Sequence, residues 1–561
     1  MEYRREPIAV VGMGCRFPGA DGTDALWELL LAGGDATGPT PKDRYDAEAM
    51  YSPEPALGKV IAKRSGYLER AFDFDAPFFG MTPAQATYLD PQQRLLLTAA
   101  YEAFADAGLT REAVAGTRTG VYVGNMNLDF WDVIARRGPE AITPSVIYNL
   151  RSVLSGRLAY EFDLRGPSIT VDTACSSSLT ALHLACLSLR AGETEAALVA
   201  GVNLKLNAEE DLLLSQARMF ARDGRCKFGD ARADGFAPSD GAAAVVLKPL
   251  AKALADGDPV HALVLGGNLG NDGRASGSLL APSIDAHAEM LRLAHEDAGI
   301  DAADVDFIEA HGTGTPLIDP IEFAAIGDVL GKDRPADRPV LVGSVKTNIG
   351  HTEGAAGVAA VIKTALSLKH RRLPASLHYE TPNPKIDWAA LPVAVPTATV
   401  DLDGRGRPLL AGVSGQGISA ANAHLILGEA PRREAAPDDG RAYPFVLSAA
   451  TGPALLDRAR DCAAWISGTT HALRDVCYSA AVRTTHHAHR AAVHAETRAG
   501  LAAALLAIAD GDAPAPEGVG AAFCDGEDVD WTAVFDDTAT FVRLPHYPWQ
   551  YATFPIPEED R

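Results

Sequence analysis

One cysteine of this chain lies where an apolar strand gives way to an apolar helix. Ile169 and Val171 end a predicted strand, and Cys175 follows four residues later. Beyond it, apolar residues recur on one helical face at Leu179, Leu182, Cys186 and Leu189. A residue at such a junction meets free backbone N–H groups and the positive end of the helix dipole. Both favour the thiolate, the nucleophilic form, so Cys175 is a candidate catalyst.

The same alternation of strand and helix signals continues through residues 8–430, with glycine-rich turns between them. Strands are predicted at Thr119–Val123, Ala197–Val202, Ala242–Leu247, Ala262–Leu265 and Leu341–Val345. Helices are predicted at Gln93–Ala107, Ala286–Ala298 and Gly354–Leu368. Alternation of this kind is typical of an α/β architecture.

The chain has 561 residues, too many for one ordinary core, so two or three domains are expected. A charged, proline-containing linker near residues 430–442 separates the first from the rest. After it we predict a small unit with a strand at Phe445–Leu447 and two alanine-rich helices. The tail Val542-Arg-Leu-Pro-His-Tyr-Pro-Trp-Gln550 has prolines that suit an extended segment laid on a surface. The predicted domains are 1–430, 431–520 and 521–561.

Two segments of the first domain look like structural counterparts. Ile169–Leu189 reads as a strand, a polar turn and a helix, and Val342–Leu368 reads the same way, although the two share few residues. Such a pseudo-repeat would place Cys175 and His351 at matching helix entrances, facing each other.

Charge and cysteine usage narrow the class of protein. The formal net charge is −23, whereas phosphate binding needs a basic surface, so no nucleic-acid partner is expected. The seven cysteines are scattered and odd in number, which indicates neither a disulfide framework nor a zinc site. The N-terminus shows no signal core, and the longest apolar stretches, such as Leu501–Ile508, are too short to span a membrane. A cytoplasmic enzyme without a metal site is expected.

Two histidines share the character of the Cys175 segment. His311 lies in Glu309-Ala-His-Gly-Thr-Gly-Thr315 and His351 in Asn348-Ile-Gly-His-Thr-Glu-Gly-Ala-Ala-Gly357, both beside glycines just after apolar strands. Glycines let a backbone approach a ligand closely. One cysteine and two histidines suffice for thioester exchange and for stabilising a developing oxyanion. From spacing alone, a buried structural cysteine remains an equal alternative.

The motifs around these three residues resemble the signatures of β-ketoacyl synthases, specifically the ketosynthase domains of modular type I polyketide synthases. The resemblance spans roughly residues 5–430, with the motifs in family order. It rests on Val171-Asp-Thr-Ala-Cys-Ser-Ser-Ser-Leu, Glu309-Ala-His-Gly-Thr-Gly-Thr and Lys346-Thr-Asn-Ile-Gly-His. Supporting matches are Pro7–Gly19, Asp90–Leu97 and Asp223–Lys227.

The resemblance implies a thiolase fold, with two mixed-sheet halves layered α-β-α-β-α, in a homodimer. The second unit resembles the small α/β linker domain that follows such ketosynthases. The tail resembles the segment that normally follows an acyltransferase. Neither an acyltransferase nor a carrier domain is recognised in the sequence, so we expect a free-standing enzyme. Its expected partners are an acyl carrier protein and a separate acyltransferase.

The resemblance also implies roles for individual residues. Cys175 would accept an acyl group from the phosphopantetheine of a carrier protein. His311 and His351 would drive decarboxylation of the second substrate and stabilise its enolate. Supporting roles are implied for Lys346 and Glu322 in the electrostatic network, for the backbone N–H groups of Cys175 and Gln416 as an oxyanion hole, and for Thr313 and Thr315 at the pantetheine arm. No bound cofactor is implied.

Two departures from the family pattern lie in the loops of this site. Gln416 stands where the family usually has a gating phenylalanine, and Ile318 where it has glycine. A glutamine can hydrogen-bond a polar acyl chain, and an isoleucine adds bulk and excludes a positive φ. Both departures fit a working chain-extending enzyme. They also fit an intramolecular cyclase that acts through a Cys175 thioester, as in the salinosporamide-type γ-lactam-β-lactone pathway. A non-catalytic partner like the chain-length factors is a second alternative.

Overall fold

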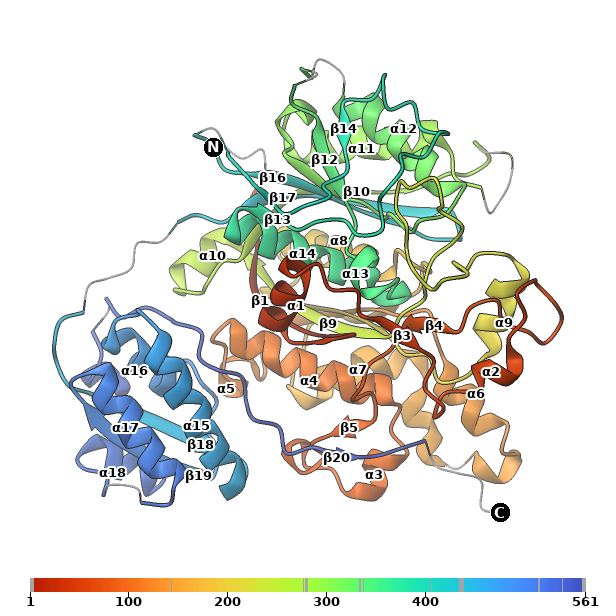
Figure 1. Cartoon of the computed structure of the whole chain (residues 1–561). Coiled ribbons are helices and arrows are strands. Elements are labelled where there is room, and N and C mark those ends of the chain that lie inside the picture. Colours follow the sequence, from red (N-terminus) through yellow and green to blue (C-terminus); the bar gives the residue numbers. More distant parts are fainter. Residues whose placement is uncertain are drawn as a thin grey trace.

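The computed structural model describes residues 5–556 except 143, 276, 278–280, 332–333, 336, 405, 433–437, 513–514 and 537. Its main body is an α/β fold in five layers, in which helices lie on both outer faces and between the sheets of two halves (Figure 1). The linker unit, in blue, stands to one side of this body. These layers agree with the thiolase fold that the sequence predicts.

The two halves of the body have the same strand order. The first contains β1 (Ile8–Phe17), β6 (Thr119–Gly124), β7 (Ser168–Val171), β8 (Ala196–Asn203) and β9 (Gly241–Pro249), in the order β7-β6-β8-β9-β1. The second contains β10 (Ala262–Asn271), β11 (Phe307–Glu309), β12 (Val340–Gly343), β16 (Leu410–Gln416) and β17 (Ala421–Glu429), in the order β12-β11-β16-β17-β10.

Strand direction repeats as well. The first three strands of each order run parallel and the next two pairings are antiparallel. An antiparallel pairing of β1 with β10, with Ala9 opposite Leu263, joins the halves. The pseudo-repeat predicted from the sequence is therefore confirmed by topology, since Cys175 and His351 each follow the third strand of their half.

The helices that separate the halves lie against one another at their N-terminal ends. They are α8 (Ser177–Arg190) and α14 (Ala356–His370). The backbone N–H of Val358 donates to Ser178 Oγ at 3.2 Å. A Cβ on Gly357 would lie 2.4 Å from the Leu179 nitrogen, so only glycine permits this approach. The outer layers are α4 (Pro91–Asp106) and α7 (Arg151–Glu161) on one side and α11 (Ile284–Ala298) and α12 (Ile318–Leu330) on the other.

The helix starts differ from the predicted ones. α8 begins at Ser177, so Cys175 lies in the turn before it. His351 is not at the entrance of α14 but lies between the short helix α13 (Lys346–Ile349) and the 3₁₀ turn Glu353–Ala355. The glycine-rich sequence there breaks the helix into pieces, which the apolar periodicity alone does not reveal.

The linker unit has its own core. It contains β18 (Tyr443–Ala449), β19 (His489–Ala495), α15 (Gly452–Gly468), α16 (Leu473–Val482), α17 (Arg498–Ala509) and α18 (Val519–Cys524). The sequence predicted two helices where three precede residue 510, and it missed β19. Phe523 and Phe535 belong to this core, so the unit extends beyond the predicted border at residue 520.

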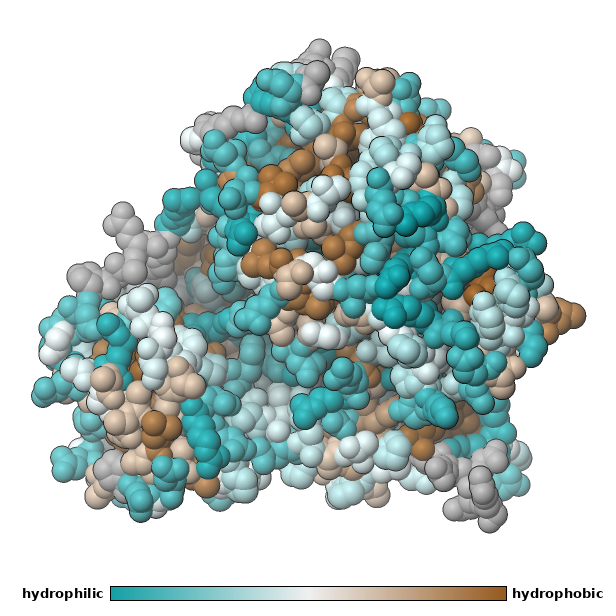
Figure 2. Space-filling model, viewed as in Figure 1, coloured by the Kyte–Doolittle hydropathy of each residue, from teal (hydrophilic) through white to brown (hydrophobic). Residues whose placement is uncertain are grey.

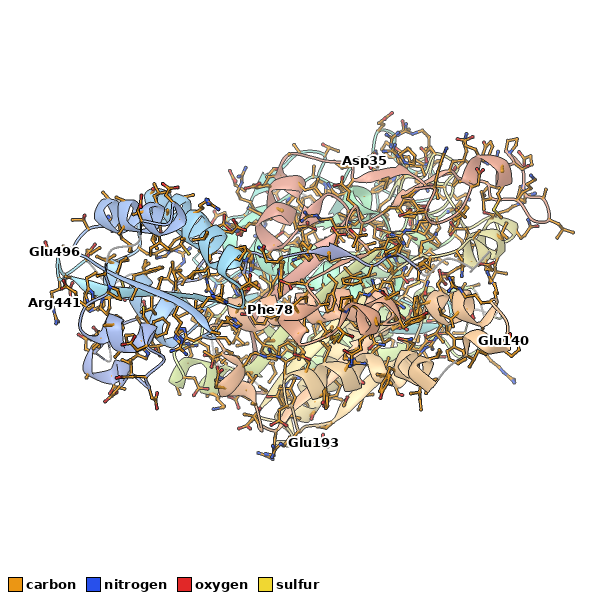
Figure 3. All side chains as sticks on the ribbon, turned by 90° about the horizontal axis from the view of Figure 1, so that it is seen from below. Asp35, Phe78, Glu140, Glu193, Arg441 and Glu496 are labelled. Atoms are coloured by element: carbon orange, nitrogen blue, oxygen red, sulfur yellow. The ribbon has the colours of Figure 1, made fainter. Side chains whose placement is uncertain are left out.

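The C-terminal segment is extended and runs back across the body, as the prolines predict (Figure 1). It pairs Ala552 in β20 (Ala552–Thr553) with Phe74 in β5 (Asp73–Phe74), and Trp549 Nε1 donates to Glu102 Oε1 at 2.9 Å. Figure 3 shows Phe78 where the linker unit meets the body. Its ring centroid lies 4.8 Å from that of Trp549 and 5.2 Å from that of His487 in the linker unit, so one aromatic cluster ties three segments together.

The surface in Figure 2 carries apolar residues in separate groups, mainly over the second half of the body, with hydrophilic residues between them. In the described part of the chain, no helix combines the length and apolar character needed to cross a bilayer.

Candidate functional site

A cavity lies where the strand ends of both halves meet the middle helices. It brings together seven of the predicted site residues: Cys175, His311, Thr313, Thr315, Ile318, His351 and Gln416. Apolar side chains form much of the remaining wall, among them Met219, Phe236 and Ile418. Lys346 and Glu322, the other two predicted residues, are buried behind this lining.

Cys175 is held by a strained turn. Ala174, the residue before it, has φ of 56°, a left-handed conformation that is uncommon without glycine. Asp172 Oδ1 accepts from the Ala174 N–H at 3.0 Å, and Ser177 Oγ accepts from the Thr173 N–H at 2.9 Å. These two hydrogen bonds stabilise the turn in its strained conformation, and in this conformation Cys175 lines the cavity.

The prediction that the helix end favours a thiolate is wrong for the resting site. Burial raises the pKa of the Cys175 thiol to about 12, the Glu353 carboxyl adds to the rise, and Lys346 opposes it. One residue, Ser176, separates Cys175 from the start of α8, and desolvation of the charged thiolate is the largest influence on this pKa. The cysteine therefore rests as a thiol.

His311 follows β11 on a turn that its neighbours fix. Glu322 on α12 accepts from the backbone N–H of His311 at 2.8 Å and from that of Gly312 at 2.9 Å. Gly312 has φ of 50°, and a Cβ there would lie 2.6 Å from that of Ser344. Glu322 thus acts on the backbone of the histidine turn and lies behind the cavity wall.

The two histidines present the same ring atom to the site. His311 Nδ1 accepts from the Gln416 N–H at 3.2 Å, and His351 Nδ1 accepts from the Glu353 N–H at 3.1 Å. Burial holds both histidine pKa values well below 6.5, with the Lys346 charge as the next cause. Each neutral ring therefore carries its proton on Nε2. The ring centroids lie 5.4 Å apart with planes at 85°, so the rings form a corner.

One of the two predicted oxyanion donors already has a hydrogen-bond partner in the protein. The Gln416 N–H is bonded to His311 Nδ1, so it reaches a substrate oxygen only by sharing that bond. The strand end around it packs against the cysteine turn, where a Cβ on Gly417 would lie 2.2 Å from the Thr173 oxygen. Gln416 is thus adjacent to the Cys175 turn through its backbone.

Lys346 is a buried cation among carboxylates. Burial lowers its pKa, while the carboxylates of Glu309 and Glu322 raise it. Glu309 Oε2 also forms an ion pair with Lys363 at 2.7 Å. The ammonium of Lys346 adds to burial in lowering the pKa of both histidines.

The predicted pantetheine positions lie on the second glycine turn of the same loop. Thr313 and Thr315 line the cavity with their hydroxyl oxygens 3.4 Å apart. Asp319, to which the sequence assigned no role, accepts from the N–H groups of Gly314 and Thr315 at 3.1 and 3.2 Å. Ile318 is the first residue of α12 and lines the cavity, as its bulk predicts.

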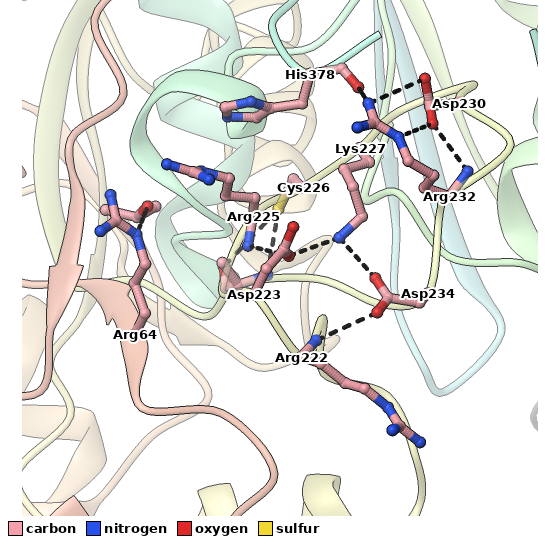
Figure 4. A network of polar contacts seen from close by, with 12 residues as sticks. Arg64, Arg222, Asp223, Arg225, Cys226, Lys227, Asp230, Arg232, Asp234 and His378 are labelled. Atoms are coloured by element: carbon pink, nitrogen blue, oxygen red, sulfur yellow. Dashed lines mark hydrogen bonds and ion pairs between the residues drawn. The ribbon is translucent and has the colours of Figure 1, made fainter. Parts of the chain in front are cut away.

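A network of ion pairs supports the rim of this loop (Figure 4). Lys227 Nζ lies 2.6 Å from Asp223 and 2.7 Å from Asp234. A Cβ on Gly314 would lie 2.4 Å from the backbone nitrogen of Lys227, so the segment that carries this network packs directly against the threonine loop. Cys226 packs behind this network, and its sulfur accepts from the Ala237 N–H at 3.3 Å.

Sequence reasoning missed His287, which is the third histidine beside the cavity. It lies on α11, and its Nδ1 is 3.4 Å from the side-chain nitrogen of Gln416. A lone histidine in an amphipathic helix usually packs in a core, so the spacing carried no signal. Asn422 and Asp272 were also missed, and they pair at 2.8 Å in the cavity wall. Among the described residues, no group of three or more metal-binding side chains gathers.

Comparison with known families and proteins agrees with this geometry. Residues 5–253 match the family described as "Beta-ketoacyl synthase, N-terminal domain", and residues 261–380 match its C-terminal counterpart. Residues 443–505 match "CurL-like, PKS C-terminal". The ketosynthase domain of oxazolomycin biosynthesis from Streptomyces albus JA3453 has a TM-score of 0.91 at 34% identity, covering 98% of this chain and 99% of that one.

Relatives with this sequence are longer proteins. Erythronolide synthase EryA2 of Saccharopolyspora erythraea is 45% identical over 520 residues, which are 91% of this chain and 14% of that protein. Phthioceranic/hydroxyphthioceranic acid synthase of Mycobacterium tuberculosis is 41% identical over 523 residues, 91% of this chain and 24% of that protein. The chain thus spans less than a quarter of either relative. With its two matched domains, its ketosynthase neighbours and a cavity lined by one cysteine and two of its histidines, the chain belongs to the β-ketoacyl synthase family and is a ketosynthase of the modular type I polyketide synthase kind.

Proposed function

We propose that this condensing enzyme joins two carrier-bound acyl units by decarboxylative Claisen-type condensation through a thioester on Cys175. The observation that carries the proposal is the pair of neutral imidazoles that lines the cavity with Cys175, each with Nδ1 occupied, which leaves the ring proton on Nε2. The matches favour neither an intramolecular cyclase nor a non-catalytic partner.

The first step is acyl exchange between two sulfurs. Cys175 loses its thiol proton and its sulfur attacks the carbonyl of the acyl-pantetheine thioester. The carbon–sulfur bond to pantetheine breaks, and the pantetheine thiol leaves with a proton, so no net charge is created. Backbone N–H groups of the turn stabilise the tetrahedral oxyanion, with Cys175 and Gln416 as the proposed donors.

The second step uses both histidines. A malonyl-type thioester loses CO₂, and the resulting enolate oxygen accepts from Nε2–H of His311 and His351. Hydrogen bonds to a developing charge in a dry site stabilise the transition state strongly. The enolate carbon then attacks the Cys175 thioester, and the cysteine sulfur leaves and regains a proton. Thr313 and Thr315 would hold the pantetheine arm during both steps.

A reaction with separate carriers tests the proposal. The protein is incubated with an acylated carrier protein, with and without a malonyl-loaded carrier, and products and CO₂ are measured. We expect chain growth that requires the malonyl unit and releases one CO₂ for each bond formed. A cyclic product released without the extender would contradict condensation, and the absence of any acyl adduct on Cys175 would contradict the enzyme itself.

The acylation rate of Cys175 is expected to rise about tenfold per pH unit from about pH 6 to 9. Burial raises the thiol pKa to about 12, so the thiolate fraction grows with pH throughout this window. No inflection is expected near pH 6.5, because both histidine pKa values lie well below it. Quenched-flow mass spectrometry of the acyl-enzyme measures the rate. A plateau above pH 7 would show instead that the thiol titrates below its ordinary range.

The exposed edge of the first half supports a homodimer. β7 is an edge strand of the sheet, and edge strands offer unpaired backbone groups to a partner. Ile169 on β7 is 42% exposed and Tyr160 on the neighbouring α7 is 81% exposed. We expect Ile169→Lys to convert a dimer into a monomer in light scattering. Leu213→Lys, at a 67% exposed position on α9 (Glu209–Gln216), is the control and should remain dimeric. A dimeric Ile169→Lys protein would exclude this face.

A further inference from the structure

Gln416 connects the reacting histidine to a second, buried histidine. Its backbone N–H donates to His311 Nδ1, while its side-chain amide nitrogen lies 3.4 Å from His287 Nδ1. His287 is 1% exposed, and Gln416 is 6% exposed and lines the cavity. The glutamine side chain is thus held at the cavity wall by a partner from another element, α11.

The hydrogen bond between Gln416 and His287 leaves other donors and acceptors of these two side chains unused. With the amide nitrogen as donor, Nδ1 of neutral His287 accepts, and its proton sits on Nε2. His287 Nε2 is buried without a hydrogen-bond partner among the described residues. The Gln416 amide also has an oxygen acceptor and a second N–H that one bond to His287 does not use. Unmet polar groups inside a protein cost free energy unless a ligand or water satisfies them.

The side-chain amide of Gln416 is a polar group of the lining that, among the described residues, is not already paired with a neighbour in the wall, apart from its one bond to His287. Asn422 and Asp272, the other polar pair of this wall, are bonded to each other at 2.8 Å. Met219, Phe236 and Ile418 elsewhere in the lining supply no comparable donor or acceptor. Because Gly417 packs against the Thr173 oxygen, the glutamine sits beside the turn that carries Cys175. A chain attached to the sulfur would share this cavity with the amide.

We propose that Gln416, oriented by His287, recognises a hydrogen-bonding group on the acyl chain bound to Cys175, so that this ketosynthase takes hydroxylated acyl thioesters in preference to plain alkyl ones. This inference rests on the proposed acyl transfer to Cys175 and adds its substrate class. His287 acts through Gln416 and is a positioning residue. The hydroxyl would bond to the free amide oxygen or to the second amide N–H.

Matched thioesters test the preference. The probes are the pantetheine thioester of pentanoate and its 3-, 4- and 5-hydroxy derivatives, and the readout is the rate of Cys175 acylation by intact-protein mass spectrometry. One additional hydrogen bond corresponds to about a three- to tenfold faster acylation by the best hydroxylated probe. Gln416→Met, which keeps the length of the side chain but removes the amide, should bring this ratio to about one.

The positioning role has its own readout. His287→Leu should lower the ratio of the acylation rates of the hydroxylated and plain probes, because the amide loses the partner that orients it. Acylation itself should continue in this variant. His287→Asn, which restores a polar partner, should recover part of the ratio. His471→Leu, at an exposed histidine of the linker unit, makes the same change away from the cavity and should keep the wild-type ratio.

The outcomes separate this inference from the proposed function. Equal rates for pentanoate and all three hydroxylated probes in the wild-type protein would overturn the inference while leaving the acyl transfer intact. No acylation by any probe, or by an acylated carrier protein, would overturn the proposed function itself. Because the wild-type ratio decides the first question, a variant that fails to fold leaves the test valid.

Discussion

Replacing Cys175 by serine is expected to remove the acyl adduct and to lower the condensation rate by at least about a thousandfold. The turn around Ala174 presents this one atom to the cavity, and no other free cysteine lines that cavity in the described residues. A hydroxyl is a far weaker nucleophile than a thiolate and a poorer leaving group in the second step. Intact-protein mass spectrometry after incubation with an acylated carrier measures the adduct, and product formation measures the rate.

Cys226→Ser is the matched control for this change. Cys226 is buried, and its sulfur accepts a backbone hydrogen bond that a serine oxygen can keep. The control should keep the adduct and most of the condensation rate. An adduct that persists in Cys175→Ser and disappears in Cys226→Ser would show that Cys226 is the nucleophile and that the assignment of Cys175 is wrong.

Strand and helix periodicity predicted most of the fold. The strand before Cys175 and the apolar face after it are visible in the sequence because a buried helix must be apolar along its length. The order of strand, turn and helix in the second half could be predicted for the same reason. The exact start of α14 was not, since the residues around His351 and Gly354 form short turns whose geometry depends on packing against α8.

Chemistry that arises from tertiary contacts was harder to predict. The sequence placed Cys175 beside a helix dipole, but only the folded protein shows that desolvation dominates its pKa. Likewise, Gln416 was recognised as a departure from the family pattern, whereas its partner His287 lies 129 positions away in the chain. A contact between such distant residues leaves no local pattern.

Replacing either histidine alone should slow decarboxylation far more than it slows acylation of Cys175. In His351→Ala we expect decarboxylation of a malonyl-loaded carrier to fall about a hundred- to a thousandfold, the usual effect of removing one donor to a developing oxyanion. Acyl transfer to Cys175 should stay within about tenfold of the wild-type rate, because the resting thiol makes no hydrogen bond to His351 among the bonds between described residues. Release of labelled CO₂ and the mass of the acyl-enzyme measure the two steps.

The same pair of measurements distinguishes two roles for His351. If its ring only donates from Nε2 to the enolate, CO₂ release falls and acylation does not. If it instead accepts the Cys175 proton, acylation should fall as far as CO₂ release does, which would contradict the assignment made from the Glu353 N–H bond to Nδ1. His471→Ala controls for loss of an exposed imidazole and should leave both rates unchanged. Because Nδ1 of His311 is occupied in the same way, His311→Ala should show the same separation, with the larger loss again in decarboxylation.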